Sequence, residues 1–193
     1  MNKYMNSNLK LWEKLTAVNV KSRMYDVEGY KQGKTSLKSL ELSELGDVKG
    51  KSLLHLQCHF GMDTLSWARN GAEVTGVDFS PSAIETARQL ASELNINAEF
   101  INCDIFDLPK HLDRQFDIVY TSYGVLCWLA DLDKWGKLIA RYLKPGGTFY
   151  IVEMHPVLNI FNNEITEARL EVKHSYFHSE EPMEWMADCS YAD

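Results

Sequence analysis

The chain has 193 residues, of which 45% are hydrophobic and 24% charged, and its net charge is −7 at pH 7. This length favours a single globular domain with a sizeable buried core, and the acidic balance argues against nucleic acid as the main partner. No stretch of the sequence approaches the roughly 18 apolar residues of a membrane span, and the opening MNKYMNSNLKLWEKL lacks the apolar run of a signal peptide. We therefore expect neither a nucleic-acid nor a membrane partner.

The cysteines indicate a reducing compartment. Cys58, Cys103, Cys127 and Cys189 are far apart in the sequence and form no C-x-x-C pair. Such scattered cysteines are typical of free thiols rather than of a disulfide framework. We therefore expect a cytoplasmic protein.

The first part of the chain predicts two helices. Apolar side chains recur at helical spacing between about residues 8 and 20, and a second helix is expected from Ser36 to Leu45, where Gly46 ends it. The polar stretch KSRMYDVEGYKQGKTS between them contains two glycines and indicates a loop or mobile segment.

Beyond residue 47 the pattern changes to short apolar segments that alternate with helical ones. Candidate strands cover 52–56, 72–77, 98–101, 116–120 and 148–152, and helices are expected over about 62–70, from Pro81 onward and over about 131–143. Ser80 is a suitable cap for the helix that begins at Pro81, which places Asp78 and Phe79 at the end of the second strand. This alternation favours right-handed βαβ units and a parallel sheet covered on both faces, an α/β fold.

In such a sheet, ligands bind outside the carboxyl ends of the strands. The segments expected there are 57–61, 78–79, 104–105, 121–125 and 153–155. Backbone amides of the first turn, next to a helix N-terminus, can face an anionic or polar ligand. Asp78 at the end of the second strand can accept hydrogen bonds from a ribose diol. Its alternative role is that of a simple turn or helix-capping acid.

The stretch LLHLQCHFGMD contains two histidines and a cysteine, which raises the question of a metal or haem site. Haem attachment needs C-x-x-C-H, which is not present. A metal site would use His55, Cys58 and His59, but side chains at a strand-to-loop transition point to opposite faces, and no second ligand cluster has zinc-like spacing. We therefore expect no metal, and we interpret the stretch as a ligand-binding turn.

Four segments occur in an order and spacing that resemble one family. These segments, within about residues 48–155, are SLLHLQCHFGMDTLSWARNGAEVTGVDFSPSAIETAR, INCDIFDLP, FDIVYTSYGVLCWL and RYLKPGGTFYIVE. Together they resemble the class I S-adenosylmethionine-dependent methyltransferases. The resemblance implies a Rossmann-like, doubly wound, mainly parallel sheet and S-adenosylmethionine as the cofactor.

The resemblance also implies a set of cofactor-binding residues. It assigns the loop to the cofactor, Asp78 to the ribose, Asp104 to the adenine amino group with Ile105 packed on the ring, and the end of the fourth strand to the methionine pocket. The full set is Gln57, Cys58, His59, Phe60, Gly61, Asp78, Phe79, Asp104, Ile105, Thr121 and, from an N-terminal segment that resembles a lid, Tyr30.

The first loop departs from the family pattern, which has an acid followed by glycines at alternating positions. His55 stands at the place of the acid, Gln57 and His59 stand at glycine positions, and Gly61 remains. Glycine there allows the backbone to approach the ligand closely. We expect binding to be retained, with these side chains pointing away or with Gln57 donating to the cofactor.

The reaction implied is methyl transfer to a small-molecule acceptor, which depends mainly on placing the acceptor in line with the methyl–sulfur bond. A general base is needed only if the acceptor must lose a proton early. We expect His155 to be that base, with Glu153 and Tyr123 as further candidates. His155 can equally be a loop histidine, and Phe60 and Trp128 can either shape the pocket or simply pack.

We expect three parts of the chain: N-terminal helices and a cofactor lid over 1–47, the cofactor-binding core over 48–155, and a C-terminal segment over 156–193. The last part contains one plausible strand, EARLEVKHSYFH, where the family has two, so either the chain is truncated or its sheet is incomplete. We favour truncation. No pattern indicates an oligomeric state.

Two other functions stay open. A nicotinamide-dependent oxidoreductase would need G-x-G-x-x-G, which QCHFGM does not supply. A module that binds S-adenosylmethionine without turnover is compatible with the altered loop and the short C-terminal part.

Overall fold

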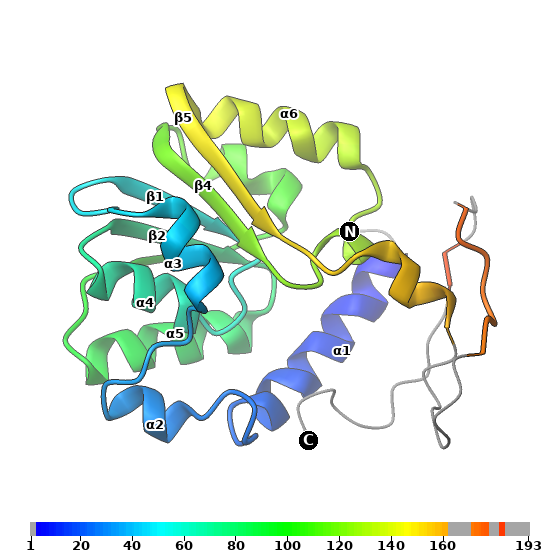
Figure 1. The fold of residues 1–193 in the computed structure, drawn as a ribbon, viewed down its shortest axis with the longest axis horizontal. Coiled ribbons are helices and arrows are strands. Elements are labelled where there is room, and N and C mark those ends of the chain that lie inside the picture. Colours follow the sequence, from blue (N-terminus) through cyan, green and yellow to red (C-terminus); the bar gives the residue numbers. More distant parts are fainter. Residues whose placement is uncertain (1–2, 162–170, 178–181, 184–193) are drawn as a thin grey trace.

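A parallel β-sheet forms the centre of the computed structural model (Figure 1), which describes residues 3–161, 171–177 and 182–183. In chain order the elements are α1 (Lys3–Asn19), α2 (Val27–Lys31), α3 (Ser39–Leu45), β1 (Ser52–Leu56), α4 (Met62–Arg69), β2 (Glu73–Asp78), α5 (Pro81–Glu93), β3 (Glu99–Asn102), the 3₁₀ helix η1 (Ile105–Lys110), β4 (Phe116–Ser122), η2 (Leu126–Trp128), α6 (Leu132–Tyr142), β5 (Leu143–Val152) and η3 (Pro156–Ile160).

The described strands form one sheet in the order β3-β2-β1-β4-β5, and all neighbouring pairs are parallel. The chain order reverses between β1 and β4, so the carboxyl ends of these two strands flank the topological switch point. All five predicted strands are confirmed, with ends that agree to within two residues except for the start of β5. The predicted α/β fold with a doubly wound parallel sheet is therefore confirmed.

Both faces of the sheet are buried. Leu54 and Leu56 of β1 pack in the cluster that includes Tyr142 of α6, whereas Leu53 packs in the cluster that includes Trp67 of α4. Alternate side chains of a strand point to opposite faces, so the apolar run in β1 serves both layers. α4 and α5 cover one face, and α6 with η1 covers the other (Figure 1).

The structure corrects the prediction for β5, which begins at Leu143 and not at residue 148. Its register against β4 shifts between Phe116 and Ile118, so the chain around Pro145 follows β4 irregularly. Proline lacks an N–H and is tolerated on an edge strand, and β5 forms one edge of the described sheet.

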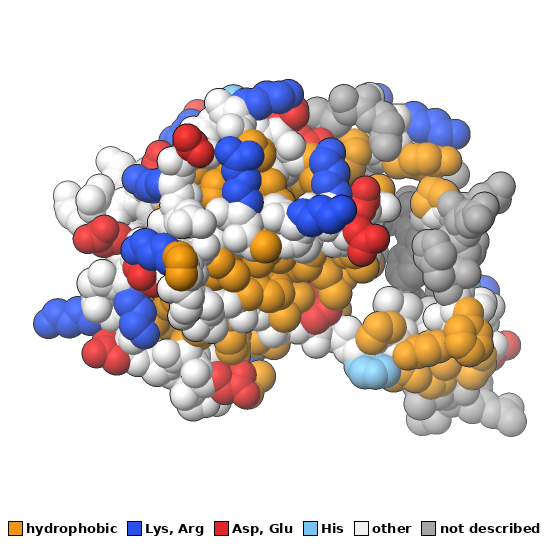
Figure 2. Space-filling model, turned by 90° about the horizontal axis from the view of Figure 1, so that it is seen from above, with side chains coloured by type: hydrophobic (Ala, Val, Ile, Leu, Met, Phe, Trp, Pro, Cys, Tyr) orange, Lys and Arg blue, Asp and Glu red, His pale blue; other side chains and the backbone are white. Residues whose placement is uncertain are grey.

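Figure 2 looks onto the side of β5 and α6 and shows hydrophobic side chains gathered below a row of Lys and Arg.

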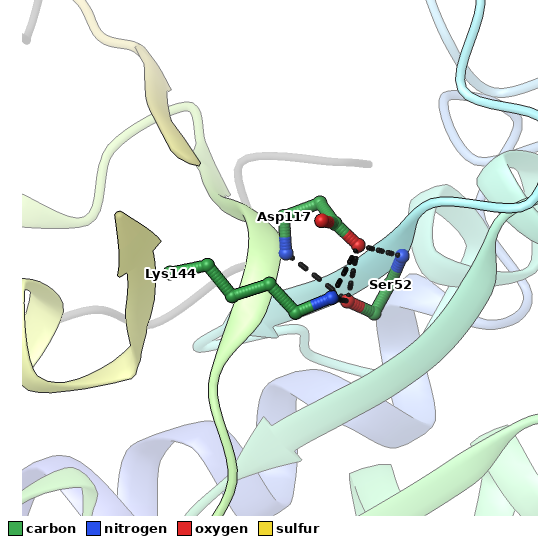
Figure 3. A network of polar contacts seen from close by, with 3 residues as sticks. All are labelled: Ser52, Asp117 and Lys144. Carbon is green, nitrogen blue, oxygen red and sulfur yellow. Dashed lines mark hydrogen bonds and ion pairs between the residues drawn. The ribbon is translucent and has the colours of Figure 1, made fainter. Parts of the chain in front are cut away.

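A polar network joins β1, β4 and β5 near their amino ends (Figure 3). Asp117 Oδ2 accepts hydrogen bonds from the N–H of Ser52 at 2.8 Å and from its hydroxyl at 2.6 Å. Lys144 Nζ lies 2.8 Å from the same oxygen. Hydrogen bonds from Lys144 and Ser52 hold the pKa of Asp117 below its usual range. The network therefore fixes three neighbouring strands at the edge away from the switch-point loops.

The prediction of a loop or mobile segment before the second helix was wrong in part, because α2 lies within it. The Asp26 side chain accepts a hydrogen bond from the Gly29 N–H and caps this helix. Tyr30 is only 1% exposed. α1 begins five residues earlier than predicted, and α3 begins at Ser39 and not at Ser36. As predicted, Ser80 caps α5 by accepting from the Ala83 N–H.

The C-terminal strand that the sequence predicted lies mostly outside the described residues. Within them, Val172 forms an isolated antiparallel bridge with Phe161. In the described part of the chain, no helix is long and apolar enough to span a membrane.

Candidate active site

The loop that follows β1 has an alternating left-handed backbone. The φ angles of Gln57, His59 and Gly61 are 51°, 52° and 77°. These are the positions at which the resembled family has glycine, and the structure shows why glycine suits them. At Gly61 a Cβ atom would also lie 2.8 Å from the Phe100 ring and 2.9 Å from the Ala87 Cβ. The backbone path of a glycine-rich loop is therefore kept, although two of its three positions hold larger residues.

Asp78, at the end of β2, holds this loop in place. Its Oδ2 accepts from the His59 N–H at 2.8 Å, and its Oδ1 accepts from the Ser80 N–H at 2.9 Å. Burial raises the pKa of Asp78 to about 6, although these backbone donors oppose the shift. Asp78 thus has the turn-forming role that the sequence left open. Each carboxylate oxygen retains a further lone pair, so the same residue can also accept from a ligand hydroxyl.

The side chain of His59 points toward α1. Asn19 Nδ2 lies 3.1 Å from His59 Nε2, and because an amide nitrogen only donates, Nε2 is the acceptor. The ring packs edge-on against Trp12 and Tyr25, with centroids 5.2 and 5.7 Å away. Burial lowers the pKa of His59 to about 3, so the ring is neutral. His59 therefore connects the loop to the N-terminal helix.

A second connection joins α1 to the start of α5. Glu13 Oε1 accepts from the Ser80 hydroxyl at 2.5 Å and from the Ser82 N–H at 3.2 Å. A carboxylate is favourable next to the positive end of a helix dipole. α1 thus crosses the carboxyl edge of the sheet at the first two loops. Sequence reasoning missed Glu13 and Asn19, because helical periodicity identifies the buried face of α1 but not its partners.

His55 and Cys58 both contact Thr64, whereas the His59 side chain points toward α1. His55 Nδ1 lies 2.8 Å from the Thr64 hydroxyl, and burial lowers the pKa of His55 to about 3. Cys58 is 4% exposed and packs in the core cluster of α4 and α5, where burial raises the pKa of its thiol. No group of three His, Cys, Asp or Glu side chains in the described residues is placed to hold a metal ion.

The expected adenine side lies at the end of β3. Asp104 caps η1 by accepting from the Phe106 N–H at 2.9 Å, and its side chain is half-buried, as is Phe79. Ile105 is 6% exposed and belongs to the core under α6. Asp104 and Phe79 therefore lie at the correct edge of the sheet, whereas Ile105 is mostly covered by protein.

The loop after β4 is held by Glu153. The Glu153 carboxylate accepts from the N–H groups of Gly124, Val125 and Leu126 at 2.5, 2.7 and 3.1 Å. Burial raises the pKa of Glu153, but its backbone donors outweigh this and lower the pKa overall. Thr121 is fully buried and donates to the Leu56 carbonyl. Both residues thus organise the loops between which a ligand would bind.

Of two further expected site residues, one lies apart from these loops and the other is buried in the core behind the first loop. His155 is exposed and caps η3, with its Nδ1 accepting from the Val157 N–H at 3.2 Å. Tyr30 lies in the core, where Ser66 donates to its hydroxyl at 3.3 Å and the Arg69 guanidinium stacks 4.1 Å from its ring centre. The structure thus brings together Gln57, His59, Phe60, Gly61 and Asp78. Tyr30 packs in the same core cluster as Phe60, whereas His155 lies apart.

Comparison with known proteins identifies the family of this chain. A family described as "Methyltransferase domain" matches residues 54–151, just over half of the chain. The chain belongs to this family. The match begins in β1 and ends in β5, so it covers the sheet with its first four loops.

Individual proteins similar to this chain are also methyltransferases. A ubiquinone biosynthesis O-methyltransferase from Alkalilimnicola ehrlichii is 31% identical over 130 residues, 65% of this chain and 52% of the relative. Its counterpart in Klebsiella pneumoniae is 30% identical over 135 residues, 68% of this chain and 55% of the relative. The chain thus spans about half the length of these curated relatives.

Solved structures show the same fold. A structure of DhpI in complex with SAH has a TM-score of 0.57 and 24% identity, over 77% of this chain and 68% of that one. A structure from work on echinomycin biosynthesis has a TM-score of 0.54 and 28% identity, over 68% of this chain and 54% of that one. The Rossmann-like architecture of the class I methyltransferases is therefore confirmed for this chain.

Proposed function

We propose that this protein transfers the methyl group of S-adenosylmethionine to a small-molecule acceptor. The observation that carries the proposal is the loop after β1, in which three alternating left-handed residues precede α4 and pack beside Asp78 at the switch-point edge. The amides of Cys58, His59 and Gly61 bond within the protein, so the amides available to a ligand are those of the first turn of α4, which begins directly after the loop. The backbone path of the loop is retained despite Gln57 and His59, in a chain whose family is that of methyltransferase domains.

The residues of this edge fit the cofactor. The buried Gln57 Oε1 has no hydrogen-bond partner among the described residues, so it can accept from a bound ligand. The absence of a side chain at Gly61 leaves the turn close to Phe100. We infer that Asp78, at the end of β2, accepts from the ribose and that Asp104, after β3, accepts from the adenine amino group. When bound, S-adenosylmethionine supplies the sulfonium methyl group.

The protein's own contribution to the reaction is placement and exclusion of water. Trp12 lies between His59 and Trp128, with ring centroids 5.2 and 5.5 Å away. α1 thus covers the edge of the site. This position supports the division of the chain into a cover over residues 1–47, a cofactor-binding core over 48–155 and a C-terminal segment over 156–193. Positioning two reactants in line can itself accelerate a methyl transfer.

We infer that the protein is cytoplasmic, that its acceptor is a small molecule and that it has no nucleic-acid partner. The relatives named above as O-methyltransferases support a small molecule. The net charge of −7 is unfavourable for a phosphate backbone. The three described cysteines are free, which supports a reducing compartment. His155 is retained as the proposed base only if the acceptor reaches η3.

A second candidate is binding of S-adenosylmethionine without turnover. It is favoured by the altered loop, in which the larger residues Gln57 and His59 hold two of the three left-handed positions. Turnover with any acceptor would eliminate it. A nicotinamide-dependent activity has no support in the family match.

Isothermal titration of the full chain with S-adenosylmethionine, S-adenosylhomocysteine and NAD tests the proposal. We expect both adenosyl ligands to bind and NAD not to bind, after which release of S-adenosylhomocysteine is screened across acceptors. A folded protein that binds neither adenosyl ligand would overturn the proposal. Binding of NAD in their place would favour the oxidoreductase.

A further inference from the structure

His59 holds a left-handed backbone position at which the family pattern has glycine. Its φ is 52°, and a residue with a side chain adopts this region at a cost in free energy that glycine avoids. Gln57 shows the same departure, with a φ of 51°. Such strain persists only where the surrounding structure compensates for it. The contacts of the two side chains therefore show what each replacement contributes.

α1 and the segment that follows it hold the His59 side chain. Asn19, the last residue of α1, is 0% exposed, and its Nδ2 lies 3.1 Å from His59 Nε2. Trp12, two helical turns earlier, packs edge-on against the same ring at 5.2 Å, and Tyr25 does so at 5.7 Å. Glycine at position 59 would remove these contacts and could still adopt the backbone path of the loop.

α1 is attached at a second point and reaches both halves of the site. Glu13 accepts from the Ser80 hydroxyl and from the Ser82 N–H at the start of α5. Trp12 also packs against Trp128 of η2, in the loop after β4, with ring centroids 5.5 Å apart. α1 therefore lies across the edge of the sheet at which open α/β folds bind their ligands.

These attachments use protein side chains only, so they do not depend on a bound ligand. A ligand held between the loops after β1 and β4 lies under α1, and it can leave only when α1 moves away. Local detachment of one element requires less free energy than unfolding of the whole domain. Opening of such a cover often sets the rate at which an enzyme exchanges its ligands.

We propose that His59 is a positioning residue that fastens α1 over the cofactor edge, and that α1 must detach from His59 before the cofactor enters or leaves. The inference rests on the proposed methyltransferase function for the identity of the ligand. The attachment itself depends only on His59 and its partners Asn19 and Trp12. The residue that replaces glycine thus controls the rate of cofactor exchange.

A first experiment measures the attachment without any ligand. Hydrogen exchange is compared in the wild type, His59→Gly and Gln57→Gly. Both variants relieve left-handed strain in the same loop, but only His59→Gly removes the hydrogen bond and ring contacts with α1. We expect exchange in α1 to increase about fivefold or more in His59→Gly, with no increase in β1 or β4 and none in Gln57→Gly. Equal exchange of α1 in the two variants would overturn the proposal.

A double-mutant cycle shows whether His59 acts through its partner on α1. Asn19→Leu keeps a side chain of similar size but cannot donate to His59. We expect it to increase exchange in α1 of the wild type, and to add clearly less in the His59→Gly background, because the hydrogen bond is already lost. Fully additive effects would show that the two side chains support α1 independently, which contradicts the proposed attachment.

A second experiment measures ligand exchange by surface plasmon resonance with S-adenosylhomocysteine. Since α1 must open for both entry and exit, we expect His59→Gly to raise the association and dissociation rate constants together, each by about fivefold or more. The dissociation constant should then change by less than about threefold. The control is Lys14→Ala, an exposed residue of α1, which should keep both rates. Faster dissociation with unchanged association would show that His59 stabilises the bound ligand directly, and would overturn the proposal.

Failure of the proposed function has a different signature. In that case the wild type gives no response to S-adenosylhomocysteine, and control of cofactor exchange by His59 falls with the function. If the wild type binds the ligand but His59→Gly exchanges it at the wild-type rates, only the present inference is wrong. Hydrogen exchange in α1 decides in both cases whether His59 fastens the helix.

Discussion

Gly61 occupies a position where both the backbone and the packing require glycine. Its φ is 77°, and a methyl group there would meet the Phe100 ring at 2.8 Å. We expect Gly61→Ala to destabilise the protein by roughly 3 kcal/mol, from left-handed strain and overpacking together. The matched control is Gly50→Ala, since Gly50 has a φ of 72° in the turn closed by the Lys51 N–H and the Val48 carbonyl, and no neighbour lies within 4 Å of an added Cβ. Urea unfolding of both variants measures the difference, and equal losses would contradict the packing argument.

His55 predicts an acid-sensitive contribution to stability. It is 3% exposed, and burial lowers its pKa to about 3 in the folded protein, against 6.5 as the ordinary value. The unfolded chain therefore binds more protons between these values, so stability falls as the pH decreases from about 6.5 toward 3. The loss amounts to at most about 1.4 kcal/mol per pH unit.

The measurement compares His55→Gln with the wild type in urea unfolding at several pH values, so that contributions from other groups cancel. We expect the wild type to lose more stability than the variant as the pH falls from 6.5 to 4.5. The control is His111→Gln at an exposed position. An unchanged slope in His55→Gln would refute the assignment.

For individual residues, the sequence predicted which ones surround the first loop, but it did not predict all of their contacts. The glycine-like positions, Asp78 and Asp104 could be located from strand ends and the family pattern. The contact of His59 with Asn19 could not be predicted, because these residues are 40 positions apart in the sequence. Local sequence patterns do not determine how α1 packs against the first loop. Tyr30 was expected at a lid but lies in the core, since its burial depends on the tertiary position of α2.

At the scale of elements, the bridge between α1 and α5 predicts local rather than global loosening. Glu13 accepts from Ser80 and Ser82 at the α5 N-terminus. We expect Glu13→Ala to cost about 1–2 kcal/mol and to increase hydrogen exchange in α1 more than in β1 or β4. Exchange is measured against Lys14→Ala, which changes an exposed residue of the same helix. A uniform increase throughout the sheet would show that Glu13 supports the whole fold instead.

The elements were predicted best where local sequence alone determines them. β1 and α5 follow from an apolar run and from the Ser80–Pro81 cap, and both appear as expected. The start of β5 was missed because Pro145 and the glycines after it indicate a turn, whereas an edge strand tolerates them. α2 was missed because five residues are too few for a periodic signal, and a side-chain cap with tertiary packing stabilises the helix.

For the whole molecule, the proposed cofactor predicts a rise in thermal stability by linkage. A ligand that binds only the folded state at about 100 times its dissociation constant adds about 2.7 kcal/mol. For a chain of this size, that corresponds to an increase of roughly 5–11 °C in Tm. The increase should occur with S-adenosylmethionine and S-adenosylhomocysteine but not with NAD.

The variant Asp78→Ala decides whether the binding site is the one described. Asp78 joins the loop after β1 to the start of α5, so its removal lowers the Tm without ligand and also removes a proposed ribose partner. We therefore expect the ligand-induced rise to fall by more than half at the same ligand concentration, whereas Glu44→Gln should keep it. If Asp78→Ala retained the full rise, the cofactor would bind elsewhere, and the geometry of the switch-point edge would no longer account for the function.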